Sequence, residues 1–199
     1  IESLRISVTD RCNFRCVYCI PNEDIAWMPR AQMASLEELA RIARVAVGLG
    51  VRKLRITGGE PLLRKNLPSL VAELANLPGL DDLALTTNGT ELPRLARDLA
   101  EAGLERVNVS LDSLDRATFA KLAQRDLLPD VLAGIDAAVD AGLTPISINC
   151  VVIRGTNDHE IVPMARFFRE NFGGGIVLRF IEYMDVGATN GWRMDEVLP

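Results

Sequence analysis

Three cysteines within eight residues are the feature of this 199-residue chain with the clearest chemical meaning. Cys12, Cys16 and Cys19 are separated by three and then by two residues. A secreted disulfide framework would distribute an even number of cysteines along the chain, whereas thiolates gathered in one segment are typical of a metal centre. Three thiolates suit an iron–sulfur cubane with one open iron, while a structural zinc site needs four closed ligands. We therefore predict a 4Fe–4S cluster, with zinc as the alternative.

Two further residues are candidates for a fourth ligand. Cys150 lies in an apolar run whose alternation points the thiol away from the polar side of the strand, so we expect it to be a small buried hydrophobic residue. His159 follows Asn157 and Asp158 at the start of a predicted helix, where we expect it to lie at the surface. Neither residue is assigned to the metal centre.

The elements that must position the cysteines follow a repeated order of strand, loop and helix. The clearest helix starts after Ser35, which forms a capping box with Glu38, and ends at Gly50. Later helices are expected to end near Gly79, Gly103, Gly142 and Gly173. Six strands are predicted over residues 4–9, 53–57, 83–87, 106–111, 145–152 and 176–181. Such repeats form either an open doubly wound sheet or a βα barrel.

The pattern within the strands distinguishes these two architectures. A strand covered by helices on both faces is apolar nearly throughout. Here the apolar residues at positions 4, 6 and 8 alternate with Arg5, Ser7 and Thr9, and most of the other strands alternate in the same way. Parallel strands with one polar face require a sheet that curls, so that helices cover the apolar face and the polar face lines a lumen. We therefore expect a closed or half-closed βα barrel with a solvated lumen.

The predicted lumen carries an excess of positive charge. Its polar strand faces contain Arg5, Lys53, Arg55 and Arg179, with Asp112, at a strand end, as the only acid. Two like charges about 8 Å apart repel by about 2 kcal/mol at an effective dielectric constant of about 20, and arginine cannot lose its proton to relieve this. The pattern predicts an anionic ligand with several charges, such as a phosphate chain. The alternative is that some of these side chains extend outward or pair with acids on loops.

Two motifs lie at the carboxyl ends of adjacent predicted strands, where βα barrels carry out their chemistry. The cysteine segment follows the first strand, and Thr57-Gly58-Gly59-Glu60-Pro61 ends the second. Together with Tyr18 before the last cysteine, they resemble the motifs of the radical S-adenosylmethionine (SAM) superfamily. Residues 4–13, 52–57, 86–89, 107–113 and 178–184 further resemble the GTP 3′,8-cyclase family, so that the resemblance covers nearly the whole chain.

The resemblance implies a fold and a reaction. The fold is a partial (βα)6 TIM-like barrel of the radical SAM type, in agreement with the strand pattern. The activity is that of a radical SAM lyase that converts GTP to (8S)-3′,8-cyclo-7,8-dihydroguanosine 5′-triphosphate in molybdenum cofactor (molybdopterin) biosynthesis, with a 4Fe–4S cluster and SAM as cofactors. The implied partners are GTP, an electron donor of the reductase, flavodoxin or ferredoxin type, and the next enzyme of the pathway. The oligomeric state is left open, with a homodimer as one option.

The resemblance also implies residue roles. Cys12, Cys16 and Cys19 would hold the cluster that reduces SAM. The positions that match SAM contacts of the family are Tyr18, Gly58, Gly59, Glu60, Ser110, Asn149 and Met184. Those that match GTP contacts are Arg5, Lys53, Arg55, Thr86 and Arg179. Paired glycines would let the backbone approach a ligand closely, and Ser110 would offer a neutral hydroxyl.

The chain departs from the family pattern in two ways. Ser147 stands where the family commonly has a lysine that contacts GTP, and this favours, as the alternative function, a radical SAM enzyme that acts on a peptide or a tetrapyrrole. The family also has a C-terminal region with a second 4Fe–4S cluster, which does not occur before Pro199. We therefore expect residues 1–199 to be the radical SAM core domain of a longer protein. A third interpretation is a zinc-stabilised nucleotide-binding module.

Composition narrows the classes of function. The chain is 48% hydrophobic and 25% charged, and it contains neither an 18-residue apolar stretch nor a signal-like N-terminus. We therefore expect a cytoplasmic protein without membrane contact. A net charge of −5, a pI near 5.0 and the lack of a basic block argue against nucleic-acid binding. Neither a dinucleotide-binding glycine motif nor a P-loop motif is present, which argues against NAD and P-loop enzymes.

Overall fold

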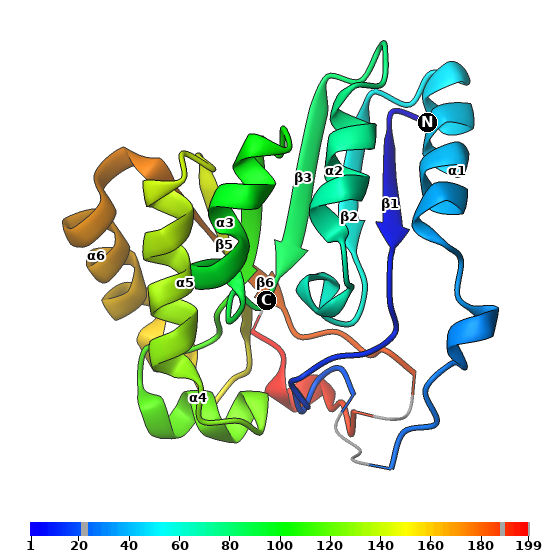
Figure 1. The fold of residues 1–199 in the computed structure, drawn as a ribbon. Helices are drawn as coiled ribbons and strands as arrows, with labels where there is room; N and C mark the ends of the chain where they lie inside the picture. The colour runs from blue at the N-terminus through cyan, green and yellow to red at the C-terminus, as the bar shows by residue number, and fades with distance from the viewer. Residues whose placement is uncertain (21–23, 188–189, 199) are drawn as a thin grey trace.

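The computed structural model describes residues 1–20, 24–187 and 190–198. Within them, six parallel strands form one sheet in sequence order: β1 (Ser3–Ser7), β2 (Lys53–Thr57), β3 (Asp82–Thr87), β4 (Arg106–Ser110), β5 (Ile146–Val152) and β6 (Ile176–Glu182) (Figure 1). All six predicted strands are confirmed, with ends that differ by at most two residues. Because β1 and β6 are the two edges of the sheet, the barrel is open between them.

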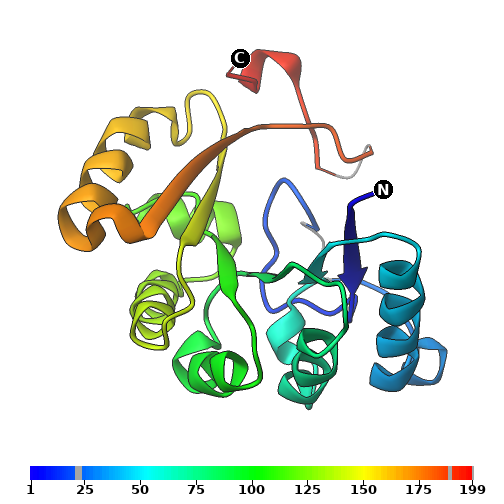
Figure 2. The ribbon, with the colours of Figure 1, turned by 90° about the horizontal axis from the view of Figure 1, so that it is seen from above.

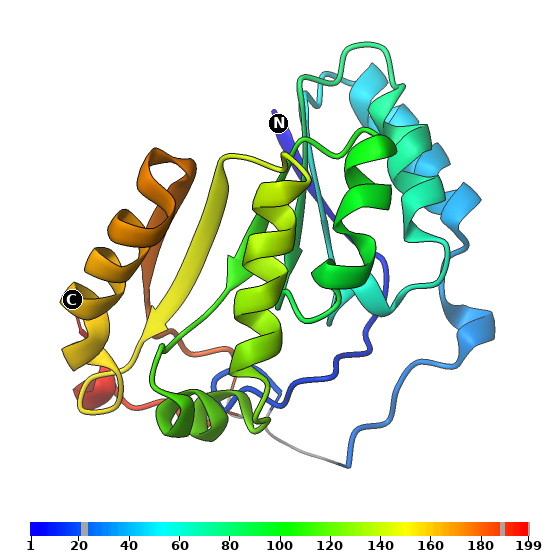
Figure 3. The same cartoon turned by 60° about the vertical axis from the view of Figure 1, so that its left-hand side comes forward.

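Six α-helices connect or follow the strands in the part of the chain that the structure describes. They are α1 (Leu36–Gly48), α2 (Leu67–Ala75), α3 (Leu92–Glu101), α4 (Arg116–Ala123), α5 (Leu128–Asp140) and α6 (Ile161–Phe172). Figures 2 and 3 show the helices as a curved outer layer around the sheet, whose inner face they leave uncovered. The predicted partial (βα)6 barrel is therefore confirmed. None of the described helices is long and apolar enough to cross a membrane.

Local sequence signals set the helix ends. The backbone N–H of Glu38 donates to the Ser35 hydroxyl at 3.1 Å, and the backbone N–H of Ser35 donates to the Glu38 carboxylate at 2.8 Å, which completes the predicted capping box of α1. Gly50 follows the helix with a φ of +101°, a conformation that glycine adopts without strain. Gly79, Gly103, Gly142 and Gly173 also have positive φ after later helices, as expected from the sequence.

The alternation in the strands separates an apolar outer face from a polar inner face. Leu54 and Ile56 are at most 1% exposed, whereas Arg55 between them is partly exposed. Cys150 is buried in the core, as predicted from its place in the alternation. The expectation of a solvated lumen is wrong at Asn108 and Ser147, which are paired in register on β4 and β5 and are almost completely buried, whereas Ser110 and Asn149 further along these strands are partly exposed. Asn108 instead satisfies its amide within the sheet, by donating to the Leu85 carbonyl at 3.2 Å.

Candidate functional site

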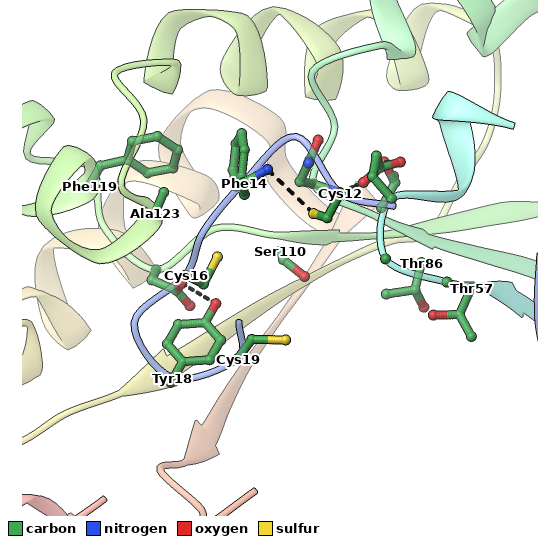
Figure 4. Close-up of a pocket in the computed structure, with 16 residues that line it drawn as sticks. Cys12, Phe14, Cys16, Tyr18, Cys19, Thr57, Thr86, Ser110, Phe119 and Ala123 are labelled. Carbon is green, nitrogen blue, oxygen red and sulfur yellow. Dashed lines mark hydrogen bonds between the residues drawn. The ribbon is translucent and has the colours of Figure 1, made fainter. Parts of the chain in front are cut away.

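A pocket lies at the carboxyl ends of the strands, beside the loop that carries the cysteines (Figure 4). It is lined by Cys12, Phe14, Cys16, Tyr18, Cys19, Thr57, Gly58, Gly59, Glu60, Thr86, Thr87, Asn88, Ser110, Asp112, Phe119 and Ala123. These residues come from α4 and from the ends of β1, β2, β3 and β4, together with the loops that follow them. Segments distant in sequence therefore meet where a βα barrel places its active site.

All three predicted cluster ligands line this pocket. Burial raises the pKa of the Cys12 and Cys19 thiols, and burial together with the charge of Asp112 raises the pKa of Cys16 to about 12. A thiolate here is therefore costly unless a cation neutralises it, which iron would do. No three His, Cys, Asp or Glu side chains among the described residues converge to hold a single metal ion. A cubane does not require such convergence, because each cysteine binds a different iron.

Backbone contacts hold the loop that carries the cysteines, residues 12–19, against the end of α4. The N–H of Arg15 donates to the carbonyl of Ala123 at 3.1 Å, and the N–H of Val17 donates to the carbonyl of residue 122 at 3.0 Å. The last carbonyls of a helix have no partner within the helix, so the cysteine loop caps α4. Phe14 packs edge-to-face on Phe119 of α4, with 5.9 Å between the ring centroids.

A closed ring of three side chains ties the cysteine loop to the end of β3. The amide nitrogen of Asn88 donates to the side-chain oxygen of Asn13 at 2.7 Å, and the amide nitrogen of Asn13 donates to the Thr90 hydroxyl at 3.0 Å. The Thr90 hydroxyl completes the ring by donating to the side-chain oxygen of Asn88 at 2.9 Å. Asn13 directly follows the first cysteine, so this ring fixes the loop near its start.

Glu60 joins the ends of β2 and β3. One carboxylate oxygen accepts the N–H of Leu62 at 3.0 Å and the hydroxyl of Thr87 at 2.7 Å, and the other accepts the N–H of Asn88 at 2.7 Å. The side chain is 1% exposed, and burial raises its pKa to about 7 although these three donors oppose the shift. Glu60 lines the pocket as predicted for a SAM contact, but both of its oxygens already bind groups of this chain.

The paired glycines of the second motif are required by the packing of the chain itself, and their predicted contact with SAM stays a prediction. A Cβ atom at Gly58 would lie 2.6 Å from the carbonyl oxygen of Thr9, and one at Gly59 would lie 2.3 Å from that of Arg11. The N–H of Gly59 donates to the Thr9 carbonyl at 2.7 Å, and the N–H of Glu60 donates to the Arg11 carbonyl at 2.7 Å. The absence of side chains is thus required by the close approach of the segment that leads into the cysteine loop. The sequence interpretation attributed it to the approach of a ligand.

Tyr18 connects the cysteine loop to the ends of β4 and β5. Its hydroxyl donates to Oδ2 of Asp112 at 2.5 Å, and Oδ1 of Asp112 accepts the N–H of Val151 at 2.8 Å. Burial raises the pKa of Asp112 to about 6, and burial with the nearby Asp112 charge holds the pKa of Tyr18 well above its ordinary value. Figure 4 shows the hydroxyl of Tyr18 on the side of Cys16.

The inner face of the sheet brings arginines together below the pocket. Burial lowers the pKa of Arg55, and the charges of Arg5, Arg106 and Arg179 lower it further, which places these guanidinium groups within electrostatic range of one another. Arg179 also donates to the side-chain oxygen of Asn108 at 3.4 Å. The prediction that cations of different strands share one lumen is confirmed for Arg5, Arg55 and Arg179.

The charge inventory of the lumen needs a correction. Asp112 is not its only acid, because Asp82 at the start of β3 forms a bidentate pair with Arg106, with N–O distances of 2.8 Å and 2.5 Å. Lys53 is exposed and is the register partner of Asp82. The sequence analysis started the third strand at residue 83 and therefore left Asp82 out of the lumen. Arg106 is not one of the four predicted cations and Asp82 lies on β3, so this pair does not bear on the alternative that those cations pair with acids on loops.

The pocket contains many, but not all, of the predicted cofactor and substrate residues. Five of the predicted SAM contacts line it, namely Tyr18, Gly58, Gly59, Glu60 and Ser110, as does Thr86, a predicted GTP contact. Asn149 is outside the lining and is paired in register with Ser110. Met184 follows β6 and is 58% exposed, outside the lining as well. His159 is exposed, as predicted.

Seven lining residues were not assigned to the site from the sequence. They are Phe14, Thr57, Thr87, Asn88, Asp112, Phe119 and Ala123. Thr57, Thr87 and Asn88 lie at the carboxyl ends of predicted strands, and that position alone could have identified them. Phe119 and Ala123 come from α4, and nothing in their spacing points to the cysteines.

Comparison with known proteins decides the family. Residues 6–168 match the profile of the Radical SAM superfamily. The chain belongs to the radical SAM superfamily. This radical SAM protein is 55% identical over its full length to a GTP 3′,8-cyclase of Acidothermus cellulolyticus, of which it covers 56%. It is 46% identical over its full length to that of Pelotomaculum thermopropionicum, of which it covers 60%. The chain therefore spans somewhat more than half the length of these relatives.

Solved structures of radical SAM proteins share the fold. HydG, a maturase of the FeFe-hydrogenase, matches all of this chain and 46% of its own with a TM-score of 0.76 at 13% identity. Streptococcus suis SuiB bound to S-adenosylmethionine matches 94% of this chain and 42% of its own with a TM-score of 0.74 at 22% identity. At these identities the likeness concerns the fold, and it supports the partial barrel described above.

Membership of the superfamily gives a 4Fe–4S cluster and SAM as the cofactors, and the pocket fits both. Desolvation raises the pKa of all three cysteine thiols, although Cys19 is exposed at the surface, so a cation would favour their thiolate form. Opposite them, the turn at Gly58 and Gly59 and the hydroxyl of Ser110 supply compact polar groups rather than bulky side chains.

Proposed function

We propose that this radical SAM protein is the catalytic domain of a lyase that converts GTP to (8S)-3′,8-cyclo-7,8-dihydroguanosine 5′-triphosphate in molybdopterin biosynthesis. The arginine group of the lumen carries the proposal, because a triphosphate offsets the repulsion among Arg5, Arg55 and Arg179 and matches the fork of donors on each guanidinium. Arg55 shares a strand face with Thr57 of the pocket and lies two residues, about 7 Å, below it. The phosphates would therefore extend away from the cysteine pocket.

The relatives named GTP 3′,8-cyclase support this proposal through identities of 46% and 55% over the whole chain. Because the chain covers 56% and 60% of their lengths, the proposal concerns the whole protein. Residues 1–199 would form its radical SAM core domain, and a further region would carry a second 4Fe–4S cluster.

Cys12, Cys16 and Cys19 would hold the cluster of this domain. When bound, the cluster and SAM supply an electron and a 5′-deoxyadenosyl radical that can take a hydrogen atom from a substrate. The chain's own contribution is to hold the three cysteines in place before the cluster binds. The hydrogen bonds from Arg15 and Val17 to α4 and the ring around Asn13 hold the loop between the cysteines in one conformation.

The remaining predicted contacts form two groups. Tyr18, Gly58, Gly59, Glu60 and Ser110 would border SAM within the pocket, and Asn149 and Met184 would extend that surface along β5 and β6. Arg5, Lys53, Arg55, Thr86 and Arg179 would bind GTP, with Thr86 at the boundary between the groups because it lines the pocket from β3. Charge-assisted hydrogen bonds from the arginines would orient the triphosphate and leave the ribose towards the pocket.

The reaction is tested with anaerobically reconstituted full-length protein, dithionite, SAM and GTP deuterated at C3′. We expect 5′-deoxyadenosine that carries deuterium, together with a cyclised nucleotide of unchanged mass apart from the label, both measured by mass spectrometry. Formation of 5′-deoxyadenosine without deuterium, or at the same rate without GTP, would contradict GTP as the substrate. Cys16→Ala serves as the control without a complete ligand set.

One observation favours a second candidate substrate class. Ser147 is 2% exposed and is paired in register with Asn108 and Val177, so the position of the family's lysine adds no charge to this lumen. A radical SAM enzyme for a peptide or a tetrapyrrole would need fewer cations at this position. If the wild type already binds GTP and Ser147→Lys only strengthens that binding, the GTP assignment holds. Equal binding of guanosine and GTP by the wild type would favour the second class.

The proposed reaction also requires an external partner. A reductase, flavodoxin or ferredoxin would supply the electron, and the next enzyme of the molybdopterin pathway would take the product. With these partners, the reaction would take place in the cytoplasm. Replacement of dithionite by a reduced flavodoxin in the same assay tests the first of them, with loss of turnover as the contrary result.

A further inference from the structure

We infer that Asp112 is a positioning residue that keeps the hydroxyl of Tyr18 from donating a hydrogen bond to the sulfur of Cys16, and thereby keeps the reduction potential of the cluster low. The inference rests on the proposed ligation of the cluster by the three cysteines. It gives a role to the hydrogen bond between Tyr18 and Asp112, which neither the binding of the cluster by the cysteines nor the cations of the lumen explain.

The hydroxyl of Tyr18 has two acceptors within reach. It donates to Oδ2 of Asp112 at 2.5 Å, and it lies near enough to Cys16 to lower the pKa of that thiol. The sulfur of Cys16 and the hydroxyl of Tyr18 lie on the same side of the loop in Figure 4. A phenol has a single hydrogen to donate, and a charged carboxylate is a stronger acceptor than sulfur. Asp112 therefore takes the hydrogen bond that Cys16 would otherwise receive.

Asp112 holds its own position without Tyr18. Its Oδ1 accepts the N–H of Val151 at 2.8 Å, and its main-chain carbonyl accepts the side-chain amide of Asn157 at 2.7 Å. Each carboxylate oxygen accepts a hydrogen bond, which is the pattern of an ionised group. The carboxylate is thus held after the end of β4 by contacts that do not involve Tyr18.

This arrangement acts on the cluster in one direction. Hydrogen bonds to cluster sulfurs and the net charge nearby are two of the factors that set the potential of an iron–sulfur cluster. A hydrogen bond donated to a cysteine sulfur stabilises the more negative, reduced cluster and raises the potential, whereas a nearby carboxylate lowers it. Asp112 takes the hydrogen bond of Tyr18 away from the sulfur of Cys16, and it also places a negative charge near the cluster. Both effects make the reduced cluster a stronger electron donor.

The sharpest test is Asp112→Asn in full-length reconstituted protein. The asparagine oxygen can still accept the N–H of Val151, but its NH2 group then faces the oxygen of Tyr18, which frees the phenolic hydrogen for Cys16. A redox titration followed by electron paramagnetic resonance reports the potential, and the relevant cluster is identified by the change of its signal on addition of SAM. We expect a shift to more positive potential.

The same substitution in a Tyr18→Phe background separates the two influences. Only the charge of Asp112 is then lost, so we expect a smaller positive shift than in the tyrosine background. An equal shift in both backgrounds, or no shift in either, would overturn the inference. If the wild-type protein assembled no cluster on the three cysteines, the proposed ligation itself would fail, and this inference with it.

A second measurement has one arm, Tyr18→Phe, that does not require Asp112→Asn to fold. Electron–nuclear double resonance in H2O and D2O detects exchangeable protons next to the reduced cluster. Because the phenolic hydrogen is directed to Asp112, Tyr18→Phe alone is expected to leave the strongly coupled exchangeable protons unchanged, whereas Asp112→Asn adds one. Loss of such a proton in Tyr18→Phe would show that the hydroxyl already binds the sulfur and would refute the inference.

Discussion

Replacement of Glu60 by glutamine removes the buried carboxylate that joins β2 to β3. The glutamine oxygen can still accept from Leu62 and Thr87, but its NH2 group then faces the N–H of Asn88, which lies 2.7 Å from the present oxygen. A buried N–H left without an acceptor costs about 1 to 3 kcal/mol. The variant is therefore expected to be less stable than the wild type in mildly acidic solution.

The pH dependence has a defined sign. Burial raises the pKa of Glu60 from 4.5 to about 7, so the folded protein binds this proton more tightly than the unfolded chain does. The stability associated with this group is therefore complete below pH 4.5 and is lost as the pH rises through 7, to a total of about 3 kcal/mol. Because glutamine does not titrate, the advantage of the wild type over the variant should be about 2 to 3 kcal/mol smaller at pH 8 than at pH 5.

Urea unfolding of both proteins at several pH values between 5 and 8 measures this difference. The matched control is Glu73→Gln on the exposed side of α2, which makes the same chemical change outside the buried network. A difference in unfolding free energy between wild type and Glu60→Gln that stays constant across the range would refute the argument that burial of the Glu60 charge costs stability.

Three further predictions follow from the site. Cys16→Ala should lose the iron and sulfide bound after anaerobic reconstitution, whereas Cys150→Ala should retain both; equal losses would contradict the ligand assignment. Arg55→Gln should weaken GTP binding about ten- to a hundredfold, by removal of a charge-assisted hydrogen bond of about 1.5 to 3 kcal/mol, and should leave guanosine binding unchanged in equilibrium titrations. Gly59→Ala should lower the unfolding free energy by about 1 to 3 kcal/mol, because the new Cβ would lie 2.3 Å from backbone, whereas Gly174→Ala, with no atom within 4 Å, should change it by less than about 0.5 kcal/mol in calorimetry.

The faces of the strands could be predicted because side chains alternate with a period of two. Parallel strands in register then place residues of one face side by side, which is why Arg5 and Arg55 could be assigned to one lumen before the fold was known. The exposure of that face could not be predicted. Asn108 and Ser147 are almost completely buried, because the alternation indicates that the sheet curls but not how much room the curled sheet leaves at its centre.

The site could be predicted as far as strand ends determine it. The cysteines and the turn at Gly58 and Gly59 meet because both follow adjacent strands. The contact between Tyr18 and Asp112 spans 94 residues and depends on the conformation of a loop, for which the sequence holds no periodic signal. The pair of Asp82 and Arg106 was missed because of a strand boundary placed one residue too late.

The strand order has a consequence for how the protein acquires its shape during synthesis. Every pairing in the sheet joins strands that are consecutive in sequence, so the sheet can grow from the N-terminus as the ribosome releases it. The cysteine loop is synthesised early, but the residues that it contacts are synthesised late. The hydroxyl of Tyr18 donates to Asp112, and the carbonyl of Tyr18 accepts a hydrogen bond from Asn190, which lies 172 residues further along the chain. We therefore expect insertion of the cluster to follow the synthesis of nearly all of these residues, which would require the thiols to stay reduced until then.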